Sequence, residues 1–403
     1  PDGQVAHFGN VTVDSVTQEP EQPIIVSYGG GHILDTEKNL YVWGRNYRGE
    51  FGTGNENEEP VPLLVSSVGK VKFLSNAPHD ARAALIKTED GRLLTAGDGD
   101  NSLNIYLLVG QTTHKSTFVD VTSYFGDQAV SANNIVGVTF TSISGAALTE
   151  TGNVWTWGEA TNGTQTAATL GRGSGATNST IPAQVSISNI KRLETFFTGY
   201  FALDTSDHLY WWGKNWIHGV DIWGTQYTPT TVPMFTTNTV SDYTCTVSSV
   251  HVIDANGDLW TAGRNHYGQL GLGSSSTTDT YTLANFQKNT FFSSKNITVS
   301  NVYGGYWHVH AYTSDGWYAW GSNYAGQIGN GNTTDTNTPI KISALDNLAI
   351  KKFWVRNGIT CFAVTADDSV YAWGSGSEYN RGDNLTTNIS TPTKITTFPS
   401  VYK

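Results

Sequence analysis

The chain has 403 residues, of which 14% are charged, and its 23 Lys and Arg against 34 Asp and Glu give a formal net charge of -11. An acidic chain without a basic run repels phosphate backbones, so we do not expect a nucleic-acid partner. No stretch of about 18 apolar residues is present, which argues against membrane insertion. The two cysteines, Cys245 and Cys361, are too few for a disulfide framework, and we expect both to be small buried thiols.

Residues 1–23 precede the regular part of the sequence and are predicted to be an extension or a linker. The stretch VAHFGNVTVDSV alternates enough to form a strand, whereas EPEQP is typical of a linker. The chain starts at Pro1 and contains a single Met, so we expect the natural polypeptide to be longer. Residues 1–23 would then attach the protein to a larger assembly.

From residue 24 to residue 403 the sequence repeats a pattern. Each copy has an alternating apolar run, a turn, and a Trp-Gly or Ala-Gly pair whose glycine we use as an anchor. The anchors lie about 55 residues apart, a period typical of propellers and repeat arrays. They are Gly44, Gly97, Gly158, Gly213, Gly263, Gly321 and Gly374.

Each copy contains the signals of about four strands and no convincing helix. Runs such as LTETGNVWTWG and VIDANGDLWTAG predict β-hairpins. A Gly-rich loop follows each anchor, and then come a β-branched run such as TPIKI and a further strand-like run such as AIKKFWV. The pattern predicts an all-β fold, a seven-bladed β-propeller over residues 24–403. We expect the strand-like IIVSY at residues 24–28 to complete a blade that the C-terminal SVYK leaves unfinished.

The loops after three of the anchors carry a specific motif. Residues 263–271 read GRNHYGQLG, residues 321–329 read GSNYAGQIG, and residues 44–52 have Glu50 in the position of the Gln. This motif resembles the signature of the seven-bladed propellers of the regulator of chromosome condensation family, and the resemblance covers residues 24–403. It implies that the Asn and Gln amides hold loop backbone. It also admits an intracellular regulator that exchanges guanine nucleotide on a small GTPase, although no exchange-specific motif is visible.

Three consecutive units carry a lengthened loop after the anchor. The glycine that aligns with QLG follows its anchor by 8 residues in units one, five, six and seven, but by 13, 13 and 11 residues in units two, three and four. Equivalent loops of neighbouring blades leave the ring on the same side, so we expect one raised patch. Exposed apolar residues on loops are typical of a contact surface, whereas the alternative is that they fill gaps between loops. The predicted partner-binding residues are Ile105, Tyr106, Leu107, Leu108, Trp216, Ile217, His218 and Trp223.

The composition suggests where such a module works. Low Lys, scarce Met and abundant Thr and Asn favour a protein outside the cytoplasm. We therefore predict a non-catalytic module on an extracellular or virion surface, such as a phage-tail receptor-binding or adhesion protein. Its partner would be a protein or glycan on a cell surface. The alternative is an intracellular regulator of the guanine-nucleotide-exchange type.

Catalytic and metal signals are weak. We find no nucleophile elbow, no phosphate loop and no telling pair of carboxylates, so neither an enzyme nor a cofactor is predicted. His308 and His310 lie two residues apart, a spacing that zinc sites use. However, His32, His251 and His308 all lie 12 or 13 residues before an anchor. A repeated histidine favours a structural role, and no metal site is predicted.

Overall fold

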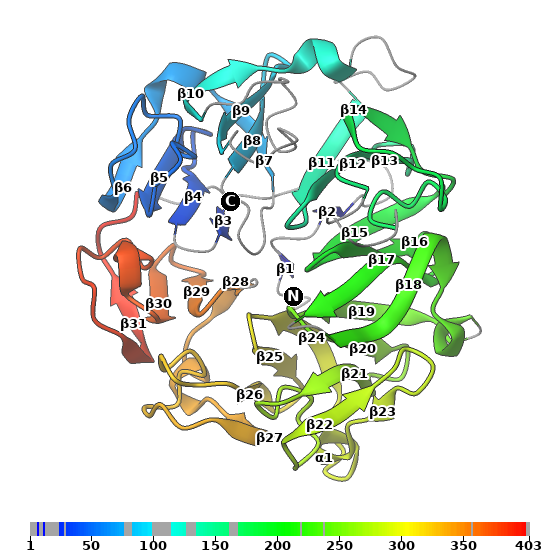
Figure 1. Cartoon of the computed structure of the whole chain (residues 1–403). Helices are drawn as coiled ribbons and strands as arrows, with labels where there is room; N and C mark the ends of the chain where they lie inside the picture. Colours follow the sequence, from blue (N-terminus) through cyan, green and yellow to red (C-terminus); the bar gives the residue numbers. More distant parts are fainter. Residues whose placement is uncertain are drawn as a thin grey trace.

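The computed structural model describes residues 6–7, 11–12, 24–27, 30–75, 83–98, 114–125, 134–160, 168–217, 220–236, 238–355 and 358–399. Seven antiparallel sheets follow one another around a ring (Figure 1), which confirms the predicted seven-bladed propeller. Each sheet is one blade, and its four main strands run in chain order from the centre of the ring outward. In the described part of the chain, no helix has the length and apolar character needed to cross a membrane.

The first four blades have the same order of strands. Blades one and two contain β3 (Ile24–Ser27), β4 (Gly30–Leu34), β5 (Leu40–Gly44) and β6 (Glu59–Leu64), then β7 (Val71–Leu74), β8 (Ala83–Thr88), β9 (Leu93–Gly97) and β10 (Lys115–Asp120). Blades three and four contain β11 (Ile135–Phe140), β12 (Ser144–Thr149), β13 (Val154–Gly158) and β14 (Ser179–Gln184), then β15 (Ile190–Phe196), β16 (Gly199–Asp204), β17 (Leu209–Ile217) and β18 (Val220–Thr231).

The last three blades repeat this order. Blade five contains β19 (Val240–Cys245), β20 (Ser249–Asp254), β21 (Leu259–Asn265) and β22 (Ser276–Tyr281), with the short β23 (Gln287–Lys288) beside β21 and the one-turn helix α1 (Thr290–Ser293) after it. Blades six and seven contain β24 (Val299–Gly304), β25 (His308–Thr313), β26 (Gly316–Gly321) and β27 (Thr336–Lys341), then β28 (Ile350–Trp354), β29 (Thr360–Thr365), β30 (Val370–Gly374) and β31 (Ile389–Ile395).

The ring closes differently from the expectation. Strand β3 is the inner strand of blade one and pairs with β4, while blade seven takes all four of its antiparallel strands from residues 350–395. The four main strands of each blade thus come from one continuous stretch of chain, so the expectation that residues 24–28 complete the C-terminal blade is wrong. The sequence period marks the hairpin but not the blade boundary, because the inner strand precedes the hairpin to which it belongs.

Two short strands lie within the predicted extension. Strand β1 (Ala6–His7) pairs in parallel with β28 of blade seven, and β2 (Val11–Thr12) pairs antiparallel with β15 of blade four. Both partners are inner strands, so this part of the chain bridges the two blades at the centre of the ring. The division of the chain at residue 23 remains a prediction.

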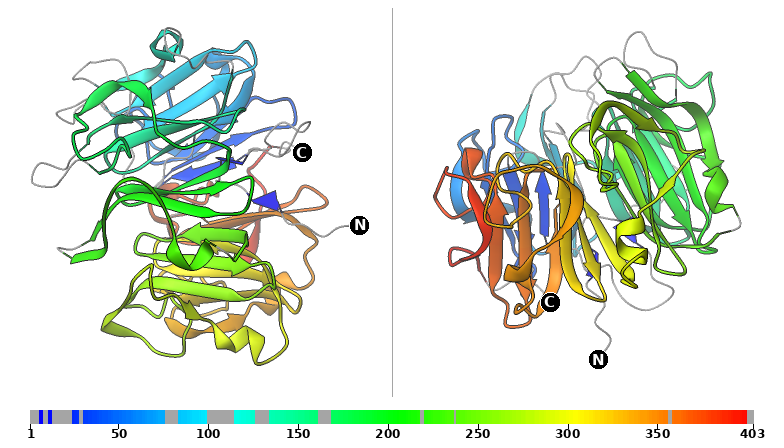
Figure 2. Two further views of the ribbon diagram at one scale, coloured as in Figure 1. Left: turned by 90° about the vertical axis from the view of Figure 1, so that its right-hand side faces the viewer. Right: turned by 90° about the horizontal axis from the view of Figure 1, so that it is seen from below.

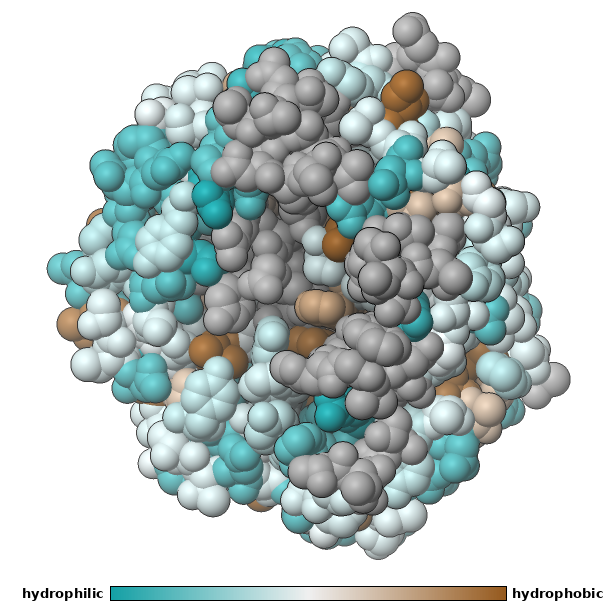
Figure 3. Space-filling view, in the orientation of Figure 1, coloured by the Kyte–Doolittle hydropathy of each residue, from teal (hydrophilic) through white to brown (hydrophobic). Residues whose placement is uncertain are grey.

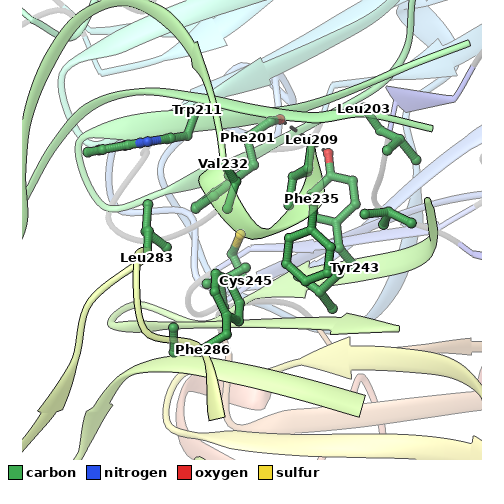
Figure 4. Packing of buried hydrophobic residues seen from close by; sticks show 14 of the residues in the cluster. Phe201, Leu203, Leu209, Trp211, Val232, Phe235, Tyr243, Cys245, Leu283 and Phe286 are labelled. Carbon is green, nitrogen blue, oxygen red and sulfur yellow. Dashed lines mark hydrogen bonds between the residues drawn. The ribbon is translucent and has the colours of Figure 1, made fainter. Parts of the chain in front are cut away.

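Apolar side chains fill the spaces between blades. In the cluster of Figure 4, Phe201, Leu209 and Trp211 of blade four meet Tyr243 and Cys245 of blade five, all of them buried. The Tyr243 hydroxyl donates to the Phe201 carbonyl oxygen at 3.1 Å, which satisfies its polar end inside the core. Both cysteines are free and buried, as predicted. One blade could not bury both of its faces alone, and packing against two neighbours buries them.

In blades one, six and seven the tryptophan of the Trp-Gly pair forms a hydrogen bond to the preceding blade. The indole Nε1 of Trp320 donates to the Gln269 carbonyl oxygen at 2.9 Å, and Trp43 of blade one donates to Asn380 of blade seven at 2.9 Å. The glycine of the QLG motif lies against the same ring, since a Cβ at Gly271 would come within 2.8 Å of Trp320. The motif therefore joins neighbouring blades, and the same contact closes the ring.

Candidate functional site

One face of the ring carries the loops between the third and fourth strands of the blades, and we call it the loop face. Asparagine side chains hold the short loops in shape. Asn265 Oδ1 accepts from Leu270 N at 3.1 Å while its Nδ2 donates to the Ser274 carbonyl oxygen at 2.8 Å. Asn46 makes the equivalent pair of bonds, with Phe51 N at 2.9 Å and the Asn55 carbonyl at 3.0 Å. Both amides are fully buried, so they satisfy loop backbone that water cannot reach.

The Gln of the motif has a second structural task. Gln269 Oε1 accepts from Tyr267 N at 2.8 Å, and Gln327 Oε1 accepts from Ala325 N at 2.9 Å. Glu50 takes the same part in blade one, where its carboxylate accepts from Arg48 N at 2.9 Å. Through these side-chain oxygens the three residues shape the loops, as the family resemblance implied.

Several aromatic residues lie on the loops of this face. Tyr47 and Tyr324 lie on loops of blades one and six and are 49% and 53% exposed. Between blades five and six, the ring of Tyr267 stacks on that of Trp307, with centroids 4.7 Å apart and planes inclined by 29°. The His266 ring also stacks on Tyr267, with centroids 5.0 Å apart, and Tyr306 meets Trp307 edge-on at 4.4 Å. We call His266, Tyr267, Tyr306 and Trp307 the aromatic stack.

The aromatic stack borders a small hollow. The hollow has a volume of about 190 Å³ and is lined by Ser248, Arg264, His266, Tyr267, Gln269 and Trp307. Pockets for drug-sized ligands usually hold about 300–1,000 Å³, so this one suits a single side chain. Among the described residues, Arg264 has no carboxylate partner, which leaves its guanidinium available to an incoming acid.

The wider surface around these residues is polar. In the side of the ring that Figure 3 presents, the described residues are coloured mostly hydrophilic, and hydrophobic ones occur in small separate groups. A broad apolar interface is therefore not what distinguishes this surface. Recognition would instead depend on a few aromatic and arginine side chains, the residue types that carry most of the binding energy in protein interfaces.

The predicted site residues have different placements. Ile105, Tyr106, Leu107, Leu108 and His218 lie outside the described residues. Trp216 and Ile217 lie in β17, at the end of a strand. Trp223 lies in β18 and is 8% exposed, with its ring edge-on to Phe196 at 5.1 Å and Phe201 at 5.5 Å. Trp223 thus packs in the hydrophobic core of the propeller. The partner-binding role of the eight residues stays a prediction.

In its described residues, 214–217 and 220–224, the insertion of unit four is β-strand. Strands β17 and β18 extend here, and Trp216 and Ile217 face Asp221 and Val220 across the hairpin. Figure 2 shows this hairpin reaching beyond the neighbouring strands on one side of the ring. Gly224, which the spacing aligned with QLG, has nothing near its Cβ position, whereas Gly171 and Gly271 each touch a tryptophan. The alternation in KNWIHGVDIWG is thus a strand signal.

A polar cluster brackets the insertion of unit two. Asp98 directly follows the anchor Gly97, and His114 lies after the inserted residues. His114 Nδ1 is 3.2 Å from Asp98 Oδ1. Arg48 of blade one donates from Nη1 to His114 Nε2 at 2.7 Å. Because His114 Nε2 accepts this hydrogen bond, the proton of the imidazole is on Nδ1, the nitrogen that faces the Asp98 carboxylate. The cluster ties the base of this insertion to blade one.

Sequence reasoning missed the aromatic stack and also misplaced a histidine. Tyr267 and Trp307 belong to different units, so spacing could not pair them. The repeat of Tyr47, His266 and Tyr324 three residues after their anchors was a usable signal.

The repeated histidines share one position in their hairpins, since His32, His251 and His310 each pair with the residue two before the anchor. His310, not His308, is therefore the repeated histidine, because the blade-six hairpin is one residue shorter. The only group of three potential metal ligands among the described residues is His308, His310 and Cys361.

Comparison with known proteins identifies the repeat. The family model described as the regulator of chromosome condensation (RCC1) repeat matches residues 38–77, 256–312 and 315–356. The chain is 26% identical to the ultraviolet-B receptor UVR8 of Arabidopsis thaliana over 93% of its own length and 81% of the relative. It is also 26% identical to protein pim1 of Schizosaccharomyces pombe, over 90% of this chain and 71% of that protein.

Solved structures share the fold. Yeast RCC1 (Prp20) in complex with Kap60 superposes with a TM-score of 0.69 at 17% identity, over 90% of this chain and 85% of that chain. Human WBSCR16 gives a TM-score of 0.71 at 14% identity, over 89% of this chain and 94% of that chain. At such identities the likeness shows the architecture, not the partner.

These relatives overturn the predicted location. A mitochondrial RCC1 domain-containing protein of Arabidopsis thaliana, RUG3, matches as well, at 24% identity over 85% of this chain. None of these relatives is a virion, phage-tail or secreted protein, so the extracellular or virion-surface interpretation and its cell-surface partner are wrong. The composition misled because the polar Gly-rich loops that every blade repeats lower the charge and raise the Thr and Asn content. The alternative of an intracellular regulator fits the relatives better.

Matching repeats, seven blades in a closed ring and alignment along most of both chains agree. The chain is an RCC1-type seven-bladed β-propeller.

Proposed function

We propose that the protein is an intracellular regulator that binds a protein partner through the loop face, with the aromatic stack and Arg264 at the centre of the contact. The observation that carries the proposal is the stacked, partly exposed set of Tyr267, Trp307 and His266 beside a hollow that suits one side chain. Neighbouring rings hold these side chains in place, so binding costs little conformational entropy.

The chemistry of the hollow favours an acidic anchor on the partner. Arg264 can form a bidentate pair with a carboxylate, and His266 lies beside it. The aromatic rings offer flat apolar area around that pair and would exclude water from it. A partner that presents Asp or Glu next to an apolar residue would match both features.

A small GTPase is the partner class that the family resemblance suggests. Nucleotide exchange requires the regulator to bind and hold the GTPase without making or breaking a bond. A rigid ring with a shaped loop face is suited to that task, because the free energy of binding then goes into distorting the partner rather than ordering the regulator.

The test uses three single variants and a panel of purified small GTPases loaded with a fluorescent guanine nucleotide. We expect the unchanged protein to bind a member of the panel and to accelerate nucleotide release. Trp307→Ala and Arg264→Gln should each weaken binding at least about tenfold, a loss of about 1.4 kcal/mol. The control is Ile181→Ala, which removes a 53% exposed side chain from the outer strand β14.

The outcomes separate the two parts of the proposal. Equal binding by Trp307→Ala, Arg264→Gln and Ile181→Ala would show that the loop-face hollow is not the contact. Binding that depends on Trp307 but leaves nucleotide release unchanged would remove exchange and keep a regulatory contact at the hollow.

A further inference from the structure

Two histidines and one cysteine meet at the boundary between blades six and seven. His308 and His310 lie two residues apart on β25 and thus on one face of the strand. Cys361 comes from β29 of the next blade. All three side chains are fully buried, and one potential ligand atom from each lies within 4.8 Å of those of the other two. None of them belongs to the loop-face hollow.

The cluster is a departure from the repeat and not part of it. His308 faces the anchor glycine of its blade. The residues in that position of the other blades are all small or carry one hydroxyl: Gly30, Ala83, Ser144, Gly199, Ser249 and Thr360. Cys361 faces the residue before the anchor, where blades five and six have Val250 and Val309. Both changes fall at the same blade boundary, beside the histidine that blades one and five share.

Several buried polar atoms at this boundary lack hydrogen-bond partners. His308 Nδ1, both ring nitrogens of His310 and Gln327 Nε2 are unpaired within the described structure. Neither nitrogen of the His310 ring reaches hydrogen-bond geometry, although the Ile328 backbone lies nearby. Buried polar atoms in native proteins are nearly always satisfied, so several unpaired atoms in one place indicate a missing ligand.

The distances suit a tetrahedral metal ion. His308 Nε2 and Cys361 Sγ are 3.6 Å apart. Zinc–nitrogen and zinc–sulfur bonds of about 2.0 and 2.3 Å in tetrahedral geometry place such a pair about 3.5 Å apart. The limit of 4.8 Å on the other pairs is about 1.3–1.5 Å wider than tetrahedral zinc ligation requires, a gap that side-chain rotations would close. The Gln327 carbonyl oxygen, which accepts from Cys361 Sγ at 3.2 Å, could supply a fourth metal ligand.

The three side chains are closed off from water, because each of them is fully buried. Phe353 and Trp373 surround His310, with centroids 5.1 and 6.0 Å away, and keep the site dry.

We propose that His308, His310 and Cys361 bind one Zn²⁺ ion that fastens blade six to blade seven. Two imidazoles and one thiolate are a donor set that selects zinc over magnesium or calcium. On binding, the metal–sulfur bond replaces the S–H bond of Cys361, and one proton leaves for each ion bound. The site is closed to solvent, so its role is structural, and the ion enters as the ring folds.

The first experiment needs no variant. The unchanged protein is expressed with added zinc, freed of loose metal and analysed by mass spectrometry for metal content, with about one zinc per chain expected. Expression in cobalt-supplemented medium should then give the intense visible absorption of tetrahedral Co²⁺ and a thiolate-to-cobalt charge-transfer band. A chain without zinc and without this band after both treatments would overturn the proposal.

Variants then locate the ligands. His308→Ser and Cys361→Val install the residues that blade five has at positions 249 and 250, so the altered boundary matches one the fold already contains. Each should reduce bound zinc at least about tenfold, and Cys361→Val should abolish the cobalt charge-transfer band. Cys245→Val, which removes the other buried thiol, should leave both signals unchanged. Full zinc content in folded Cys361→Val would contradict the proposed site.

Discussion

His251 illustrates what burial does to a single titratable residue of this ring. Its side chain is fully buried, with Nε2 3.0 Å from Ser249 Oγ, and desolvation lowers its pKa from 6.5 to about 3. The unfolded chain therefore takes up a proton below about pH 6.5 while the folded chain does not, so stability falls as the pH falls. One such histidine should cost about 2 kcal/mol between pH 7.5 and pH 5.

Urea unfolding at pH 7.5 and pH 5 measures this loss. We expect His251→Gln to lower stability at pH 7.5 but to lose less than the unchanged protein on acidification, because one group that binds a proton only after unfolding is gone. His32, whose pKa burial lowers to about 4, would still contribute in the variant. An identical loss in both proteins would contradict the account.

Gly329 tests the contact between the QLG glycine and the next tryptophan. It has φ +84°, and a Cβ there would come within 2.7 Å of Trp373 Nε1. Gly331 has a similar φ of +89°, but a Cβ there would meet only Thr391 at 3.7 Å. Both alanine substitutions incur the cost of positive φ, about 1 kcal/mol.

Only Gly329→Ala also forces the tryptophan to move, so it should be the more destabilising by about 1–3 kcal/mol. Chemical denaturation of Gly329→Ala and Gly331→Ala under identical conditions gives the comparison. Equal unfolding free energies would mean that the glycine is needed for its backbone conformation alone.

At the scale of elements, the inner strands of blades four, five and six are joined by a buried ionic network. Arg192 on β15 pairs with Asp242 on β19 and lies 3.4 Å from Glu194, and its guanidinium stacks over the Tyr243 ring at 4.3 Å. Asp242 also accepts from Val302 N on β24 at 3.0 Å. The network thus joins charged side chains of blades four and five to the backbone of blades five and six.

Removing the cation alone should be severe. Arg192→Met leaves two carboxylates buried without their partner and should cost about 3–5 kcal/mol in unfolding free energy. The control is the neighbouring residue, since Lys191 pairs with Asp207 at the surface and Lys191→Met should cost less than about 1 kcal/mol. Similar losses in the two variants, measured by urea titration, would mean that the network contributes little.

Element by element, the sequence predicted the repeated parts and missed the contacts between them. The hairpins and the seven anchors followed from alternation and turn residues, because these signals are local. The burial of Trp223 and the stacking of Tyr267 on Trp307 depend on residues from other segments of the chain, which spacing does not reveal. Likewise, counting from the anchor chose His308 over His310, because the length of a hairpin turn changes the register by one residue.

For the whole molecule, the contact between blade seven and blade one is the one that joins blades not consecutive in the chain, and apart from the two-residue strand β1 on β28 it depends on side-chain and loop contacts. Trp43 donates to the Asn380 carbonyl at 2.9 Å and packs on Phe398 at 4.8 Å, and Asn384 N donates to the Pro60 carbonyl at 3.0 Å. Blades five and six make the same tryptophan contact through Trp320, but the chain passes directly from one to the other. After a local opening, two directly connected blades remain neighbours, whereas blades one and seven can separate.

The prediction compares Trp43→Phe with Trp320→Phe by native-state hydrogen exchange and mass spectrometry. Each variant leaves one carbonyl oxygen without its indole donor, a loss of about 1–3 kcal/mol. Trp43→Phe should speed exchange at least about tenfold in the strands of blades one and seven, because the ring opens there without the rest unfolding. Trp320→Phe should speed exchange less at the boundary between blades five and six. Those two blades are joined by the chain and therefore separate less readily. If both variants raised exchange evenly around the ring, the closure would be no weaker than the other boundaries, and the ring would open only as one unit.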